Sequence, residues 1–174
     1  ITILNLICGV MACISALDGS ARVAAYFIAA GAVFDLLDGM VARMLGVSSE
    51  IGKQLDSLAD MVTFGLAPAL IAHELVLVSL YMQNGDLQLV GMDRALPFLT
   101  FILVICSALR LAKFNIDEDQ KVDFKGLPTP ANALFWLSIP LGVEIVNVPE
   151  GPLSVLMNPY ILSALCVIFG LLLV

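Results

Sequence analysis

Long apolar stretches separated by short polar connections run through the whole sequence. An α-helix needs about 20 apolar residues to cross the hydrocarbon core of a bilayer, and six stretches reach or approach that length. They cover residues 1–17, 21–44, 53–82, 95–114, 129–148 and 153–174. This pattern predicts an all-α polytopic membrane protein, with six transmembrane helices in one bundle and a single domain over residues 1–174.

The composition agrees with a chain that faces lipid. Hydrophobic residues make up 60% of it and charged residues only 13%, and its mean hydropathy is +1.02. Soluble globular domains carry about a quarter charged residues. The chain begins at Ile1 without a methionine and stops within an apolar run. We therefore expect both ends to be trimmed relative to the gene product.

The distribution of basic residues predicts how the chain is oriented. Six of the eight border the loops after the second and fourth segments: Arg43, Lys53, Arg110, Lys113, Lys121 and Lys125. Only Arg22 and Arg94 border the loops after the first and third. Short cytoplasmic loops carry an excess of lysine and arginine. We expect the second–third and fourth–fifth loops, and both termini, on the cytoplasmic side of the cytoplasmic membrane.

Four aspartates interrupt the second and third apolar segments. Asp35 and Asp38 are three residues apart and Asp56 and Asp60 four apart, so each pair shares one face of its helix. The short connection between the segments, "GVSSEIG", predicts antiparallel neighbouring helices. With a rise of 1.5 Å per residue, such a hairpin brings all four carboxylates to a similar depth, roughly 13–18 Å from the turn.

Carboxylates gathered inside a membrane indicate a cation site. Each charge at mid-membrane costs about 2.5–3.5 kcal/mol on insertion scales, and the four would also repel one another. Ligands that are all carboxylate oxygens favour a hard ion such as Mg²⁺, Mn²⁺ or Ca²⁺. Four carboxylates are enough for two ions about 3.5–4 Å apart, an arrangement that clamps a transferring phosphoryl group.

Small residues and one arginine accompany the aspartates. Gly39 and Ala42 follow the second aspartate on the same stripe, and Gly52 lies one turn before the third. Such residues let helices approach closely or leave a slot for a flat ligand. Arg43, at the rim, has a planar fork that suits a phosphate. Together these positions form the string D-x2-D-G-x2-A-R-x8-G-x3-D-x3-D.

This string resembles the signature of the CDP-alcohol phosphotransferase family of integral membrane enzymes. The resemblance implies a six-helix bundle, usually a homodimer, that binds a CDP-activated lipid and transfers its phosphatidyl group to an alcohol. It implies two Mg²⁺ or Mn²⁺ ions, with Ca²⁺ as an inhibitor or a crystal ligand. Asp35, Asp38 and Asp56 would bind the metal, and Asp60 would be a further ligand and the general base. The CDP-lipid side would comprise Gly39, Ala42, Arg43, Gly52, Asn5 and Lys53.

Other stretches bear on the acceptor alcohol. "TILNLICG", "DSLADMVTFGLAPAL", "SALRLAKFN" and "FKGLPTPANA" resemble the family members that use L-serine. The reaction expected from this resemblance moves the phosphatidyl group of CDP-diacylglycerol to L-serine in one displacement, with CMP leaving. The expected serine-binding residues are Arg110, Lys113, Asn115, Lys125 and Thr129. Arg110 is the first choice for the serine carboxylate, because a deep arginine needs an anionic partner.

The expected partners are therefore CDP-diacylglycerol, L-serine, membrane lipids and a second copy of the chain, and no nucleic-acid polymer. Three alternatives stay open at this point. A UbiA-like prenyltransferase also uses membrane aspartates and Mg²⁺, but its acidic motifs lie on distant helices of a larger bundle. A cation transporter would need neither the small-residue slot nor the arginine. Within the family, glycerol 3-phosphate or inositol phosphate as acceptor would call for more basic residues.

Overall fold

The computed structural model describes residues 1–46, 49–85, 91–116, 126–142 and 155–174 of the chain. Within these ranges the chain is helical and contains no strand. The helices are α1 (Thr2–Leu17), α2 (Ala21–Leu45), α3 (Glu50–Asp60), the π-helix η1 (Met61–Leu66), α4 (Ala67–Asn84), the 3₁₀-helix η2 (Gly91–Arg94), α5 (Leu96–Leu99), α6 (Ile102–Ile116), α7 (Thr129–Gly142) and α9 (Pro159–Leu173). The predicted all-α class is confirmed.

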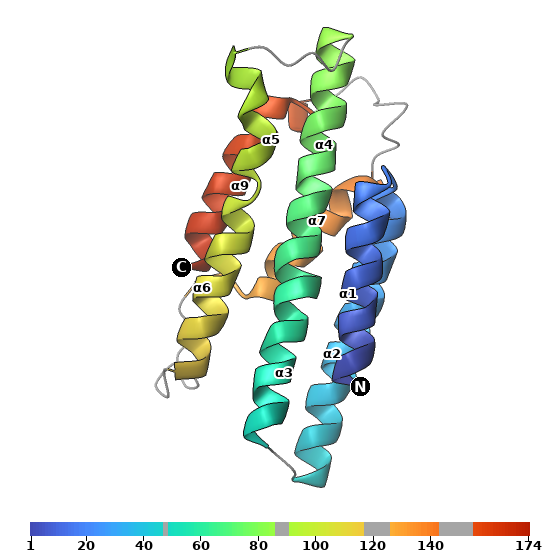
Figure 1. Cartoon of the computed structure of the whole chain (residues 1–174), viewed down its shortest axis with the longest axis vertical. Coiled ribbons are helices and arrows are strands. Elements are labelled where there is room, and N and C mark those ends of the chain that lie inside the picture. Colours follow the sequence, from blue (N-terminus) through green and yellow to red (C-terminus); the bar gives the residue numbers. More distant parts are fainter. Residues whose placement is uncertain (47–48, 86–90, 117–125, 143–154) are drawn as a thin grey trace.

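One long helical column stands at the centre of the bundle. α3, η1 and α4 follow one another without a break from Glu50 to Asn84. α1 and α2 pack on one side of this column and α6 and α9 on the other, while α7 crosses behind it (Figure 1). The C-terminal ends of α2 and α6 and the N-terminal end of α3 point toward the same end of the molecule (Figure 1).

Three helices within the described residues are long and apolar enough to cross a membrane: Ala21–Leu45, Glu50–Asn84 and Leu96–Asn115. Thr2–Leu17 and Pro159–Leu173 are apolar but shorter. Many large apolar side chains point outward, including Leu36 and Leu171, as expected of a surface that lies against lipid. The chain is therefore an integral membrane protein. Parts of the fifth and sixth predicted segments, residues 143–154, lie outside the described residues.

The core is built on α4, whose buried face carries Ile71 and Leu75. Trp136 of α7 is also fully buried, and its ring nitrogen donates to Asn132 Oδ1 at 3.1 Å. Many of the other buried residues are alanines, and small side chains allow helices in a membrane to approach closely. This close packing fixes the position of α2 relative to the central column, and therefore of the aspartates that these two elements carry.

The turn between α2 and α3 explains why the two helices run antiparallel, as predicted. α2 ends at Gly46, which has left-handed backbone angles (φ 62°, ψ 22°) that glycine adopts without strain. α3 begins earlier than expected, at Glu50, because Ser49 caps it: the Ser49 hydroxyl accepts the backbone N–H of Gly52 at 3.0 Å. The end of α2 and the cap of α3 are thus only three residues apart in the sequence.

Candidate metal and substrate site

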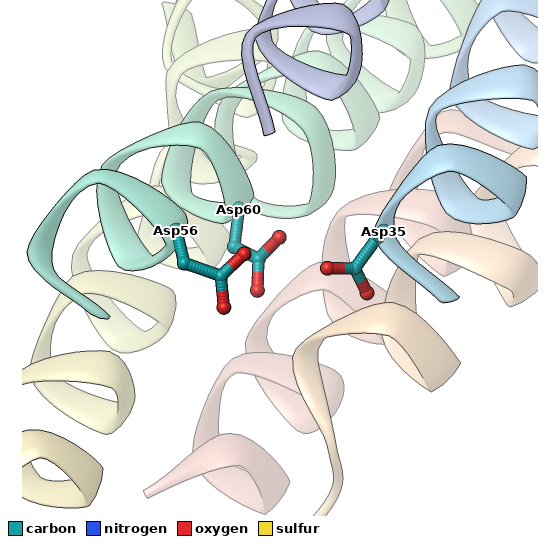
Figure 2. Close-up of side chains that lie close together, drawn as sticks. All are labelled: Asp35, Asp56 and Asp60. Atoms are coloured by element: carbon teal, nitrogen blue, oxygen red, sulfur yellow. The ribbon is translucent and has the colours of Figure 1, made fainter. Parts of the chain in front are cut away.

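Three of the four predicted aspartates meet between α2 and α3. Asp35 projects from α2 toward Asp56 and Asp60, which lie one turn apart on α3 (Figure 2). Each offers a carboxylate oxygen, and these three oxygens lie within 4.8 Å of one another. All three residues are half-buried. We call Asp35, Asp56 and Asp60 the carboxylate trio.

The chemistry of the trio fits a hard divalent cation. At the observed separation, two ionised carboxylates repel by about 3 kcal/mol even at an effective dielectric constant of about 20. A cation between them converts this repulsion into attraction. The ligands are all carboxylate oxygens, which suit Mg²⁺, Mn²⁺ or Ca²⁺ rather than softer metals. The trio could therefore hold a metal ion between α2 and α3.

Asp38, the fourth predicted ligand, is not part of the trio. The hydroxyl of Thr2, at the start of α1, donates to its Oδ2 atom. Asp38 faces a neighbouring cavity that Asp56 also lines. Thr2 was not among the expected site residues, because a threonine in the first turn of a helix has no distinctive sequence pattern.

This cavity, of about 270 Å³, opens beside the trio. Its lining residues are Thr2, Asp38, Gly39, Ala42, Ser49, Gly52, Lys53 and Asp56. Four of the six residues expected on the CDP-lipid side are among them: Gly39, Ala42, Gly52 and Lys53. A methyl group added at Gly39 would meet no atom within 4 Å, so the glycine leaves open space. We call it the nucleotide cavity, after the CDP-lipid that the sequence resemblance leads us to expect here. Asp56 belongs to both this cavity and the trio.

The other two expected CDP-lipid residues do not line the nucleotide cavity. Arg43 is exposed, and its Nε donates to the carbonyl oxygen of Gly39, on its own helix, at 3.0 Å. Asn5 is fully buried on α1, and its Nδ2 donates to Asp60 Oδ1 at 3.1 Å. Asn5 therefore reaches the site through the trio.

The expected serine-binding residues are spread over several places. Arg110 is buried in α6, and its Nη1 donates to the carbonyl oxygen of Leu173 at 3.2 Å, at the C-terminal end of α9. Thr129 is buried at the start of α7, and Lys113 is exposed near the end of α6. Lys125 lies outside the described residues. None of the described ones lines the nucleotide cavity.

Asn115, near the end of α6, lies beside a second cavity. This cavity is on the face of α3 that points away from the nucleotide cavity. The Nδ2 atom of Asn115 donates to Ser57 Oγ at 2.9 Å. This cavity, of about 390 Å³ between α3 and α6, is lined by Gln54, Ser57, Leu58, Met61, Ala108, Leu111, Ala112 and Asn115. Asp56 lines the nucleotide cavity and Ser57, the next residue, lines this one, so the two cavities lie on either side of the single helix α3. Sequence reasoning did not single out Ser57.

Known proteins are similar to this chain over most of its length. Residues 1–172 match the model of a family described as CDP-alcohol phosphatidyltransferase. The chain is 42% identical over 130 residues to the CDP-diacylglycerol–serine O-phosphatidyltransferase of Bacillus subtilis, covering 75% of this chain and 67% of that protein. It is 34% identical over 142 residues to the enzyme of the same name from Methanocaldococcus jannaschii, covering 82% and 56%.

An archaetidylserine synthase of Methanothermobacter thermautotrophicus is 33% identical over 136 residues, covering 77% of this chain and 53% of that protein. The matched region thus spans two-thirds of the Bacillus protein and about half of each archaeal one. No solved structure matches the chain.

Proposed function

Because the chain belongs to the CDP-alcohol phosphatidyltransferase family, we propose that it transfers the phosphatidyl group of CDP-diacylglycerol to L-serine, giving phosphatidylserine and CMP. The observation that carries the proposal is the position of the carboxylate trio beside a cavity that small residues, among them Gly39 and Ala42, help to line. A metal site that adjoins a slot for a flat ring is what a CDP-linked substrate requires. Serine is proposed as the acceptor because the Bacillus and Methanocaldococcus relatives are named as serine O-phosphatidyltransferases.

The aspartates would hold the substrate's diphosphate through the metal. Asp35, Asp56 and Asp60 form the trio, and Asp38, on the neighbouring face, is the candidate for a second ion. The chemistry that Mg²⁺ or Mn²⁺ supplies when bound is the neutralisation of negative charge on the diphosphate oxygens. The nucleotide would lie against Gly39 and Ala42, whose small side chains leave the cavity open.

Asp60 is the candidate general base for the displacement. A serine hydroxyl is a weak nucleophile and needs a base within hydrogen-bond reach. In the proposed step, the Asp60 carboxylate takes the hydroxyl proton. The serine oxygen bonds to the phosphorus that carries diacylglycerol, and the bond from that phosphorus to the bridging oxygen breaks. CMP leaves with the electron pair, so one displacement completes the reaction.

For the acceptor, we keep Arg110, Lys113, Asn115, Lys125 and Thr129 as candidate serine contacts. Among them, Asn115 lines the cavity between α3 and α6. Arg110 would have to serve the serine carboxylate while it also holds the end of α9. We place the reaction at the cytoplasmic face of the cytoplasmic membrane, because Arg43 and Lys53 lie beside the turn between α2 and α3. The homodimer is proposed from the family resemblance alone.

The test is an acceptor screen with the purified protein in micelles. CDP-diacylglycerol and Mn²⁺ are supplied with L-serine, glycerol 3-phosphate or inositol phosphate, and both CMP and the lipid product are measured. We expect CMP release and phosphatidylserine with serine only. Asp35→Asn should abolish the release, whereas Asp18→Asn, an exposed aspartate at the other end of α1, should not. Turnover with another alcohol would overturn the acceptor, and no CMP with any alcohol would overturn the phosphotransferase.

A further inference from the structure

Asp60 is held from α1 by an amide that no solvent reaches. Asn5 is 0% exposed, and its Nδ2 donates to Asp60 Oδ1 at 3.1 Å. A neutral donor on one oxygen restrains the carboxylate while leaving its other oxygen free to face Asp35 and Asp56. Asn5 Oδ1 has no hydrogen-bond partner in the described part of the chain, so within these residues the side chain's hydrogen bond is the one to Asp60.

Asn5 is itself held by the helical turn that follows Asp60. Thr63, also 0% exposed, lies three residues further on in η1, and its hydroxyl donates to the backbone oxygen of Asn5 at 3.1 Å. The two bonds close a loop between α1 and the central column, from Asp60 to Asn5 and from Asn5 back to Thr63. The carboxylate and the residue that orients it are thereby fixed to the same stretch of helix.

Two glycines make this arrangement possible. A methyl group added at Gly9 of α1 would lie 2.3 Å from Thr63 Oγ1, and one at Gly31 of α2 would lie 2.6 Å from Thr63 Cγ2. The added carbon at Gly31 would also lie 3.1 Å from Asn5 Oδ1. Thr63 therefore lies where η1, α1 and α2 meet, and an alanine at either glycine would collide with it.

We propose that Asn5 and Thr63 are positioning residues that hold the Asp60 carboxylate in the orientation it needs for metal binding and for proton transfer. This inference rests on the proposed function for the role of Asp60 in turnover. It replaces the expectation that Asn5 contacts the CDP-lipid. Neither residue touches the reacting atoms, and both act through Asp60.

Metal affinity gives a test that does not depend on turnover. Mn²⁺ is titrated into the purified protein in micelles and its dissociation constant is measured by calorimetry. Partners that orient a metal ligand typically change affinity or activity 10–100-fold when removed. We expect Asn5→Ala and Thr63→Val each to weaken Mn²⁺ binding by about that factor, and to lower kcat while the KM for CDP-diacylglycerol stays within about twofold. Thr63→Ser keeps the hydroxyl, so it should retain most of the wild-type Mn²⁺ affinity and most of the wild-type kcat.

Thr100→Val is the matched control. The Thr100 hydroxyl is also fully buried and donates to a backbone carbonyl, that of Pro97 at 2.7 Å, but it lies beyond α5 and away from the site. It should leave Mn²⁺ affinity unchanged. Should Thr63→Val not fold, Thr63→Ser and Asn5→Ala decide the question by themselves.

A double-mutant cycle shows whether Asn5 acts through Asp60. In an Asp60→Asn background, Asn5→Ala should cause no further loss of Mn²⁺ affinity, because residues that act as a unit are not additive. Additive losses, or a raised KM for CDP-diacylglycerol at unchanged Mn²⁺ affinity, would overturn the proposal. If the cycle is non-additive but no alcohol releases CMP, the positioning pair stands and the proposed function fails.

Discussion

At Asp56 two parts of the site share one side chain. It belongs to the carboxylate trio and also lines the nucleotide cavity, whereas Asp35 belongs to the trio alone. A metal bound at Asp56 would therefore be the contact between the protein's carboxylates and the substrate's diphosphate. The two residues should differ in what their loss does.

We expect Asp56→Asn to lower both Mn²⁺ affinity and Mn²⁺-dependent CDP-diacylglycerol binding, on the order of 100-fold or more, because a hard ion loses a charged ligand on the side that faces the substrate. Asp35→Asn should lower Mn²⁺ affinity similarly, but CDP-diacylglycerol binding less once Mn²⁺ is saturating. Binding of the lipid at a range of Mn²⁺ concentrations distinguishes them. Identical behaviour of the two variants would mean that the ion does not lie between Asp56 and the cavity.

Among the helical elements, glycine has two different uses in this site. At Gly9 it lets α1 approach η1 so closely that an added methyl group would overlap Thr63. At Gly39 it keeps the nucleotide cavity open, because nothing lies within 4 Å of an added methyl group. One glycine thus serves packing and the other serves the space that a ligand would fill.

Gly9→Ala should therefore destabilise the protein by about 1–3 kcal/mol, the usual cost of overpacking, and lower its melting temperature. Gly39→Ala should leave stability unchanged or slightly raised, since alanine is the better helix former. It should nevertheless weaken CDP-diacylglycerol binding. Thermal unfolding in detergent, with lipid binding measured on the same samples, compares the two. A stable Gly9→Ala protein would show that α1 can shift away from η1.

Sequence periodicity was enough to predict that aspartates of α2 and α3 meet, because both aspartate pairs follow helical spacing and the short turn brings their helices together, although it predicted a cluster of four rather than the trio. It could not predict that Asp38 would turn to Thr2 instead of joining the trio, since that choice depends on where α1 starts. The bond between Arg110 and Leu173 joins residues 63 positions apart, and only the packing of α6 on α9 creates it. The apolar stretch "MVTFGL" likewise has no local pattern that indicates a π-helix.

For the molecule as a whole, the trio joins α2 to α3, two helices that are otherwise connected by the short turn between them and by their shared packing against α1. A metal bound there would link α2 to the central column. A ligand that binds only the folded state stabilises it by RT ln(1 + [L]/Kd), about 2.7 kcal/mol at a hundredfold excess over Kd. We expect Mn²⁺ to raise the melting temperature and a chelator to lower it again. Asp35→Asn should abolish the shift, and a shift that persists there would place the ion elsewhere.

The proposed orientation can be tested on the whole chain in membranes. Ser49, at the α2–α3 turn, and Ser20, between α1 and α2, are both exposed and should lie on opposite sides of the bilayer. In a variant with the four native cysteines replaced, Ser49→Cys should react with an impermeant thiol reagent only in inside-out vesicles, and Ser20→Cys only in right-side-out ones. The reverse pattern would place the site on the outer face.

The π-helix η1 amounts to one surplus residue in the middle of the central column. Its backbone N–H groups reach back five residues, as from Ala67 to Val62, so the turn holds more chain than an α-helix does. Removing one residue there would return the column to the α-helical register and rotate everything beyond by about 100°. The face of α3 that carries Asp56 and Asp60 and the face of α4 that carries Ile71 and Leu75 could then no longer both keep their present contacts. The number of residues in η1 therefore sets how α3 is rotated relative to α4, and changing that number would displace the aspartates of the site.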